Sequence, residues 1–277
     1  MKTRDKKIIF TTLRYVVVVA ATLLLLFPIY EMVTTSLKQE VEAFSNPPKW
    51  FFKPTFDNYV AVLTKAGFFK YFVNSLIVAL TSTLVSVFVA ALAAYPLARN
   101  RFAGKKGVIA ATLFLRMIPP VILVVPVYVF FNSLKLTNGL LSLFIMYTAL
   151  NLPFNIWILR TFIMDLPYEL DESAFLDGCT PVAVFQRIIL PLLSPGLAVA
   201  SVFSFRLAWN EFILSLVLTN RMTRTLPVAV SLYITDTGTE WGKITAIATI
   251  IALPAFIFTF TVARSLITGL TAGAVKG

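Results

Sequence analysis

The sequence predicts an all-α polytopic membrane protein with six transmembrane helices, and three observations lead to this fold class. Of the 277 residues, 58% are hydrophobic and 13% are charged, whereas a soluble domain is about 45–50% apolar and about 25% charged. The mean hydropathy is +0.84. Long apolar segments alternate with short blocks of Lys and Arg, as membrane spans alternate with their loops. A single soluble core cannot bury so much apolar surface, so lipid is the expected environment.

Each span is located by a segment of about 20 residues that is nearly free of charge, which is the length of a helix that crosses a bilayer. The segments in chain order are Thr12–Val33, Tyr71–Ala98, Gly107–Leu134, Leu136–Leu159, Ile188–Leu218 and Ile244–Ala263. We expect the first to be a retained helix, because residues Phe27–Glu31 do not form the small-residue cleavage site of a signal peptide. Arg116 interrupts the third segment, and Arg206 and Glu211 interrupt the fifth.

The distribution of Lys and Arg predicts that both termini face the cytoplasm. Five basic residues lie within residues 1–14 and four within the short loop 99–106, whereas the next short loop contains only Lys135. We therefore expect three regions. They are a cytoplasmic N-terminus, first helix and external loop in residues 1–70, a core transmembrane domain of five helices in 71–268, and a cytoplasmic tail in 269–277.

Composition excludes several kinds of site. The sequence contains no His, which removes His-based catalytic triads, His metal sites and imidazole proton relays. Cys179 is the one cysteine, so neither an intrachain disulfide nor a cysteine metal cluster can form. Catalysis and metal binding that depend on His or on paired Cys are therefore excluded, and we assign no catalytic and no metal-ligating residue. The Lys and Arg residues that give the net charge of +11 lie in short blocks between apolar segments. We therefore interpret them as determinants of membrane topology and not as a nucleic-acid-binding surface.

The loop between the fourth and fifth spans, at about residues 166–190, is predicted to begin with a short helix. Pro167 suits the first position of a helix. Leu166, Leu170 and Ala174 recur at intervals of four residues and would form one apolar face. Acidic residues are concentrated in the N-terminal half of this helix, where they interact favourably with its dipole.

A second short helix is predicted after a tight turn at Gly178, which can end the first helix with a positive φ. Thr180 suits the N-cap and Pro181 the first position, and Pro191 is expected to end or kink the helix. Residues 165–191 carry five acids against one base, which favours docking on a partner protein with a complementary surface. The alternative is an amphipathic hairpin on lipid headgroups, which the acidity disfavours.

These residues resemble the EAA loop of ABC-importer permeases, in which Glu-Ala-Ala, Gly, Ile and Leu-Pro recur at fixed intervals. The matching residues here are Glu172, Ser173, Ala174, Asp177, Gly178, Ile188, Leu190 and Pro191. Ser173 departs from the pattern, as one small residue in place of another. Residues 117–120, 151–154, 209–212 and 269–277 resemble the carbohydrate-importer branch that includes the maltose permease subunits.

The resemblance implies a type I ABC importer transmembrane domain in a bacterial cytoplasmic (inner) membrane, acting as a permease subunit that moves a sugar or sugar derivative by alternating access. It implies a second permease subunit in a heterodimer, an external sugar-binding protein, and two ATPase subunits that bind ATP and Mg²⁺ and dock on the EAA-type loop. In agreement, the sequence contains no Gly-x-x-x-x-Gly-Lys-Ser/Thr segment, so we expect no cofactor in this chain.

Polar residues inside the spans are the candidates for a substrate pathway, because a charge within the bilayer is costly. They are Arg116, Asn151, Asn155, Arg206, Trp209, Asn210 and Glu211. Amides and carboxylates can bond sugar hydroxyls, and the two arginines would suit an anionic sugar. A structural alternative is that Arg116 pairs with Glu211 across helices and that the amides bond neighbouring helices.

Two other functions remain open from the sequence. A stand-alone secondary transporter would predict ionisable relay residues and an internal repeat, neither of which is clear here. A membrane scaffold without a transport path would leave the charged residues within the spans unexplained.

Overall fold

The computed structural model describes residues 3–45, 47, 49–236 and 238–274, with side chains between residues 10 and 262. The basic side chains of residues 2–7, part of the expected break at residues 46–48, and the side chains of the tail 269–277 lie outside the described residues. Across the described chain the elements in order are α1 (Thr3–Ser36), α2 (Glu40–Ala43), α3 (Asp57–Thr64), α4 (Phe68–Arg99), α5 (Lys105–Met117), α6 (Pro120–Ser133), α7 (Leu140–Met164), α8 (Glu169–Leu176), α9 (Pro181–Val184), the π-helix η1 (Phe185–Ile189), α10 (Leu190–Leu192), α11 (Ser194–Asn210), α12 (Ile213–Leu218), α13 (Leu226–Val230), the 3₁₀-helix η2 (Ser231–Tyr233), β1 (Ile234–Thr235), β2 (Gly238–Thr239) and α14 (Trp241–Ala274). The two strands pair antiparallel, with Ile234 opposite Thr239.

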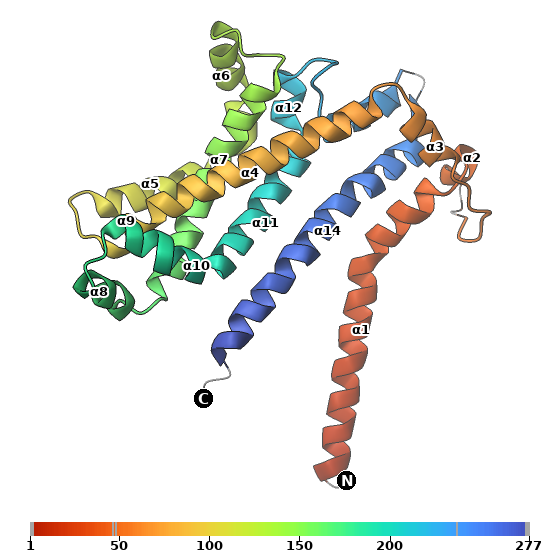
Figure 1. Cartoon of the computed structure of the whole chain (residues 1–277). Helices are drawn as coiled ribbons and strands as arrows, with labels where there is room; N and C mark the ends of the chain where they lie inside the picture. Colours follow the sequence, from red (N-terminus) through yellow and green to blue (C-terminus); the bar gives the residue numbers. More distant parts are fainter. Residues whose placement is uncertain (1–2, 46, 48, 237, 275–277) are drawn as a thin grey trace. The chain divides into compact units, whose positions relative to one another are not determined.

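Single long helices form four of the six expected spans within the described residues, namely α1, α4, α7 and α14 (Figure 1). The other two are bent pairs of helices. The axes of α5 and α6 meet at 96°, and those of Pro181–Leu192 and Ser194–Asn210 meet at 74°. The expected span over residues 107–134 is therefore a pair of helices, which together are apolar enough to count as one broken span.

The break in the third span follows from its two consecutive prolines. α5 ends at Met117, and both Ile118 (φ −74°, ψ 116°) and Pro119 (φ −64°, ψ 131°) are extended before α6 begins at Pro120. Proline has no N–H to continue a helix and disfavours the helical conformation of the residue before it. The chain therefore changes direction between the two halves.

Proline also shapes the fifth span. Pro191 cannot donate a hydrogen bond to the carbonyl of Arg187, four residues earlier, and the helix widens into η1 directly before it. The sharp bend follows at Leu193 and Ser194. Further along, α11 ends because Glu211 is extended (φ −71°, ψ 127°), so the expected span 188–218 is divided again before α12.

The chain forms two compact units, residues 1–66 with 232–252 and residues 67–231 with 253–277. In the first unit, the buried Asn58 donates hydrogen bonds from Nδ2 to the carbonyls of Ser36 (3.0 Å) and Lys38 (2.9 Å), which joins α3 to the end of α1. Burial, reinforced by the carboxylate of Glu240, raises the pKa of the Tyr233 hydroxyl. Tyr233 is therefore neutral at pH 7.

In the second unit, α4, α7 and α11 pack on one another (Figure 1). Their shared apolar cluster comprises Val87, Ala90, Ala91, Ala94, Leu159, Ile163, Ala174, Val184, Phe185, Ile189, Leu193 and Ala200. Small residues in this cluster allow close approach of the helices. Beside this cluster, Gly196 of α11 also lies close to α7, since an added Cβ would lie 2.8 Å from Cγ of Phe162.

Candidate functional site

The first candidate site is the hairpin of α8 and α9, and its local structure confirms the predicted helix–turn–helix. α8 ends in a Schellman motif, in which Cys179 N donates to Ala174 O (3.0 Å) and Gly178 N donates to Phe175 O (3.0 Å). Gly178 has a φ of +82°, a conformation that glycine adopts without strain. The hydroxyl of Thr180 then caps α9 by accepting from Ala183 N (3.3 Å).

The hairpin is fixed to the bundle by apolar packing. Ala174 of α8, together with Val184 and Phe185 of the second helix, belongs to the same buried cluster as Leu159 and Ile163 of α7. Of the predicted apolar stripe, Ala174 lies in this cluster, Leu166 packs against it just before α8, and Leu170 is partly buried. Because the hairpin and the bundle share one core, they are expected to move together.

A buried ion pair also fixes the hairpin to α4. The Oδ2 atom of Asp171 lies 3.0 Å from Nε of Arg99, and these side chains are 1% and 9% exposed. Tyr95 donates from its hydroxyl to Oδ1 of Asp171 (2.7 Å), and Arg99 also donates to the carbonyl of Leu166 (3.1 Å). Nε of Arg99 and Oδ2 of Asp171 have no hydrogen-bond partner within the described structure, so they interact as an ion pair. The end of α4 therefore holds the hairpin through this ion pair and through two charge-assisted hydrogen bonds, from Tyr95 to Asp171 and from Arg99 to the Leu166 carbonyl.

The sequence interpretation missed this role of Asp171, which it counted only among the acids near the start of α8. A signal was available, since Asp171 lies three residues before Ala174 and so beside the apolar stripe. Arg99 directly follows the apolar segment of the second span. Their pairing depends on tertiary packing, because the two residues are far apart in sequence.

The outer face of the hairpin is acidic and apolar. Glu169, Glu172 and Asp177 are exposed, and next to them Leu176 is 89% and Val182 63% exposed. Of the other EAA-type residues, the exposed ones are Ser173, Gly178 and Pro191, Ala174 is buried, and Ile188 and Leu190 are partly buried. Large apolar side chains exposed among charges are typical of a protein interaction surface.

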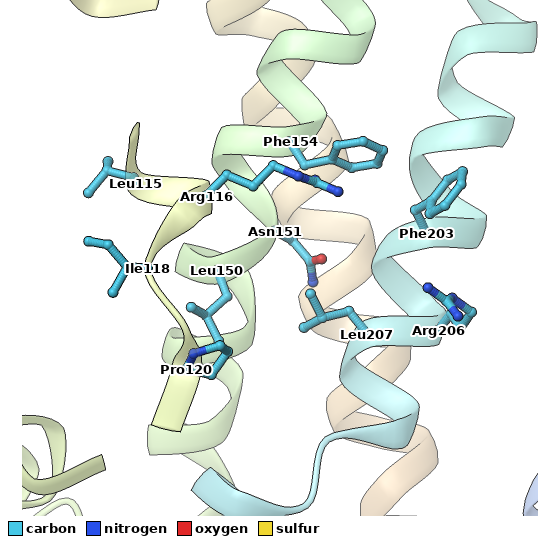
Figure 2. Close-up of a pocket in the computed structure, with 10 residues that line it drawn as sticks. All are labelled: Leu115, Arg116, Ile118, Pro120, Leu150, Asn151, Phe154, Phe203, Arg206 and Leu207. Carbon is cyan, nitrogen blue, oxygen red and sulfur yellow. The ribbon is translucent and has the colours of Figure 1, made fainter. Parts of the chain in front are cut away.

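The second candidate site is a pocket of about 230 Å³ between the α5–α6 break, α7 and α11 (Figure 2). Of the seven candidate pathway residues, the structure brings Arg116, Asn151 and Arg206 together in its lining. The guanidinium carbon of Arg116 lies 3.9 Å from the centroid of the Phe154 ring, which is a cation–π contact.

Two other candidate pathway residues lie in the packed core of the described structure. Asn155 is fully buried and donates from Nδ2 to the hydroxyls of Ser204 on α11 (2.8 Å) and Ser86 on α4 (3.2 Å). Trp209 is also fully buried, and its ring stacks on Phe205 with centroids 5.5 Å apart. The structural alternative, in which amides join helices, is confirmed for Asn155 and also for Asn151, which donates from Nδ2 to the carbonyl of Ser204 on α11 (3.4 Å).

The last two candidates lie where α11 ends. Asn210 is exposed and donates to the carbonyl of Arg206 (2.9 Å). The Glu211 carboxylate accepts from the hydroxyl of Tyr147 (2.7 Å) and from the first free backbone amides of α12, those of Leu214 (2.8 Å) and Ser215 (3.1 Å). The alternative in which Glu211 pairs with Arg116 is therefore wrong, because this carboxylate caps a helix.

Residues 86–270 match the model of a family described as "Binding-protein-dependent transport system inner membrane component". The chain belongs to this family. Inner membrane components of this kind are transport permeases and not enzymes. The fold is that of the type I ABC importer transmembrane domain, and the match includes both the hairpin and the pocket.

Two curated relatives of this permease are sugar transport proteins. The diacetylchitobiose uptake system permease protein DasC of Streptomyces coelicolor is 38% identical over 255 residues, covering 91% of this chain and 92% of the relative. The sulfoquinovosyl glycerol transport system permease protein SmoH of Agrobacterium fabrum is 34% identical over 264 residues, covering 94% and 93%.

A solved structure is similar to the permease in fold. It is a chain from the crystal structure of a bacterial ABC transporter that imports the acidic polysaccharide alginate. That chain has a TM-score of 0.77 and 20% identity, with 95% of this chain and 98% of that chain covered.

Proposed function

We propose that this permease is one of two different membrane subunits of an ATP-driven importer for a sugar or sugar derivative in a bacterial cytoplasmic membrane. Both termini face the cytoplasm, and with six spans the solvent-exposed face of the α8–α9 hairpin then lies on the cytoplasmic side as well. Residues 1–70 then contribute the N-terminus, first helix and external loop, residues 71–268 the core, and residues 269–277 the tail. The names of the two sugar permeases that are similar over nine-tenths of the chain support the substrate class.

The hairpin face carries the proposal. Two partner ATPase subunits bind ATP and Mg²⁺ and hydrolyse the nucleotide, and one of them docks on the exposed acids and on Leu176. The hairpin is suited to transmit force because Asp171 and the shared apolar cluster join it to α4 and α7. Closure of the ATPase dimer displaces the hairpin, and the bundle turns from inward-open to outward-open as one body. An external sugar-binding protein delivers the substrate.

Charge reversal on the hairpin tests ATPase docking. Glu172→Lys leaves the buried contacts of α8 intact, because Glu172 is exposed. We expect this variant to insert normally in the membrane but to lose the ATPase subunits on purification and to lose ATP-dependent sugar uptake. The matched control is Asp236→Lys, which reverses an exposed acid in the loop before β2 on the predicted external side. Retention of the ATPase by both variants would contradict the docking role.

A backbone substitution tests the hairpin geometry separately. Gly178→Pro cannot form the observed turn, because the φ of proline is fixed near −65° and that of Gly178 is +82°. Gly104 has a φ of +87°, and neither glycine has atoms within 4 Å of an added Cβ. Gly104→Pro is therefore a matched control outside the hairpin. We expect ATPase binding to be lost only in the Gly178 variant.

A further inference from the structure

The pocket between α5, α7 and α11 contains two cationic side chains. Figure 2 shows Arg116 extending from the end of α5 toward Phe154, and Arg206 on the facing side of the pocket on α11. The remaining lining is mostly apolar and includes Phe203 and Leu207. The two guanidinium groups are thus the only charged groups among the described residues that line this pocket.

No acidic side chain neutralises these two cations within the described structure. The ion pairs that the described side chains form involve neither Arg116 nor Arg206. Glu211, which directly follows α11, is occupied in capping α12. Arg116 gains some compensation from the Phe154 ring and from the carbonyl end of α5. Arg206 is exposed and has neither form of compensation among the described contacts.

The position of the pocket along the spans makes this charge unusual. Asn151 and Phe154 lie near the middle of α7 (Leu140–Met164), which is long and apolar enough to cross a membrane, so we place the guanidinium of Arg116, which rests on Phe154, near the midpoint of this span. A charge at this depth is costly, and it typically marks the path of a substrate or an ion. An apolar side chain at position 116 or 206 would avoid the cost of a charge at this depth. We therefore infer that the two arginines serve to bind a ligand.

We propose that this pocket binds an anionic group of the transported sugar, such as a carboxylate, sulfonate, sulfate or phosphate. Guanidinium groups match these oxygens with paired hydrogen bonds. The inference rests on the proposed function, and it specifies the charge of the substrate. At about 230 Å³ the pocket is smaller than the ~300–1,000 Å³ that encloses a whole drug-sized ligand. It is therefore a subsite for one charged sugar unit, whose apolar face contacts Phe203 and Leu207.

Transport of matched sugars by the complete transporter in proteoliposomes tests the proposal. The probes are a radiolabelled disaccharide and two forms of it, one with the terminal hydroxymethyl group oxidised to a carboxylate and one with that group replaced by a sulfonate. We expect Arg206→Leu to raise the half-saturating concentration of an acidic form about 10- to 100-fold, as for the loss of hydrogen bonds to a charged group. Uptake of the neutral disaccharide should be unchanged. Arg206→Lys should show a smaller loss, and Arg221→Leu, at an exposed position outside the pocket, none.

The external binding protein also selects sugars, so a second measurement is made on the permease–ATPase complex without it. Phenylglyoxal modification of each arginine is followed by peptide mass spectrometry in wild-type protein. We expect an acidic disaccharide to slow the modification of Arg206, and the neutral one to leave it unchanged. Arg221 should react equally in all samples. This measurement does not depend on the folding of any variant.

The outcomes separate this inference from the proposed function. Uptake of the neutral disaccharide alone, with no protection of Arg206 by either acidic form, overturns the inference and leaves a sugar importer. Equal loss of neutral and acidic uptake in Arg206→Leu also overturns it, because Arg206 would then serve the structure or a neutral substrate. Absence of ATP-dependent uptake of any sugar overturns the proposed function and this inference together.

Discussion

Removal of the Asp171 carboxylate is expected to weaken the joint between α8 and α4 severely. In Asp171→Ala, the guanidinium of Arg99, 9% exposed, loses its counter-ion at 3.0 Å, and the hydroxyl of Tyr95 loses its acceptor at 2.7 Å. Removing one partner of a buried ion pair costs about 3–5 kcal/mol, because the other charge remains buried without its counter-ion. Arg99 would keep its bond to the Leu166 carbonyl and its contact with the Tyr168 ring. An exposed ion pair would cost only about 0–1 kcal/mol. A measured loss above about 3 kcal/mol therefore distinguishes a buried Arg99–Asp171 pair from an exposed one.

The assay is unfolding of the purified permease in mixed micelles by titration with sodium dodecyl sulfate. Asp177→Ala is the matched control, because it removes an exposed acid from the same hairpin. We expect a loss of about 3–5 kcal/mol in the free energy of unfolding for Asp171→Ala and less than about 1 kcal/mol for the control. Hydrogen exchange should locate the loss in α8.

A double variant tests the cause. Arg99→Met with Asp171→Leu removes both charges and replaces them with apolar side chains of similar size, a change that is often neutral or stabilising for a buried pair. We expect the double variant to be more stable than Asp171→Ala alone. If Asp171→Ala is as stable as the Asp177 control, water reaches the ion pair, and the argument that it joins the hairpin to α4 is refuted.

Two further predictions concern packing and helix capping in the same unit. Gly196→Val should destabilise the permease by about 1–3 kcal/mol, because the Cβ of the valine would lie 2.8 Å from Cγ of Phe162. Thermal unfolding measures this loss. The control is Gly107→Val, where a Cβ has open space, and it should differ from wild type only through helix propensity. Glu211→Ala should cost about 1.5–3 kcal/mol and accelerate hydrogen exchange at the two amides that it caps. Tyr147→Phe removes only one of the three bonds to this carboxylate, so exchange at those amides as fast in Tyr147→Phe as in Glu211→Ala would contradict the capping role.

The turn of the hairpin could be predicted from the sequence because each signal in it is local. Gly178 ends α8, and Thr180 and Pro181 start α9, through interactions within a few residues along the chain. The positions of the spans could be predicted for a similar reason, since a bilayer selects for length and apolar composition. The family resemblance rested on these same short segments.

Tertiary structure decided which polar residues are buried, paired or accessible. Asn155 and Trp209 looked like pathway residues, yet both lie in the core between helices, while Arg116 and Arg206 share a pocket. Composition locates a span along the sequence, but it does not show which face of the helix packs against its neighbours. The two prolines predict a break after α5, but they do not determine its angle of 96°.

The sequence by itself therefore determined a helical membrane protein with an acidic hairpin between its fourth and fifth spans, since hydropathy and capping act over short distances along the chain. Only the tertiary structure decided that Asp171 is buried against Arg99, that Glu211 is occupied as a helix cap, and that two arginines line one pocket without an acid. The physical reason is that the energy of a charge depends on its solvation and on the groups around it, and here those groups come from helices that are distant in sequence.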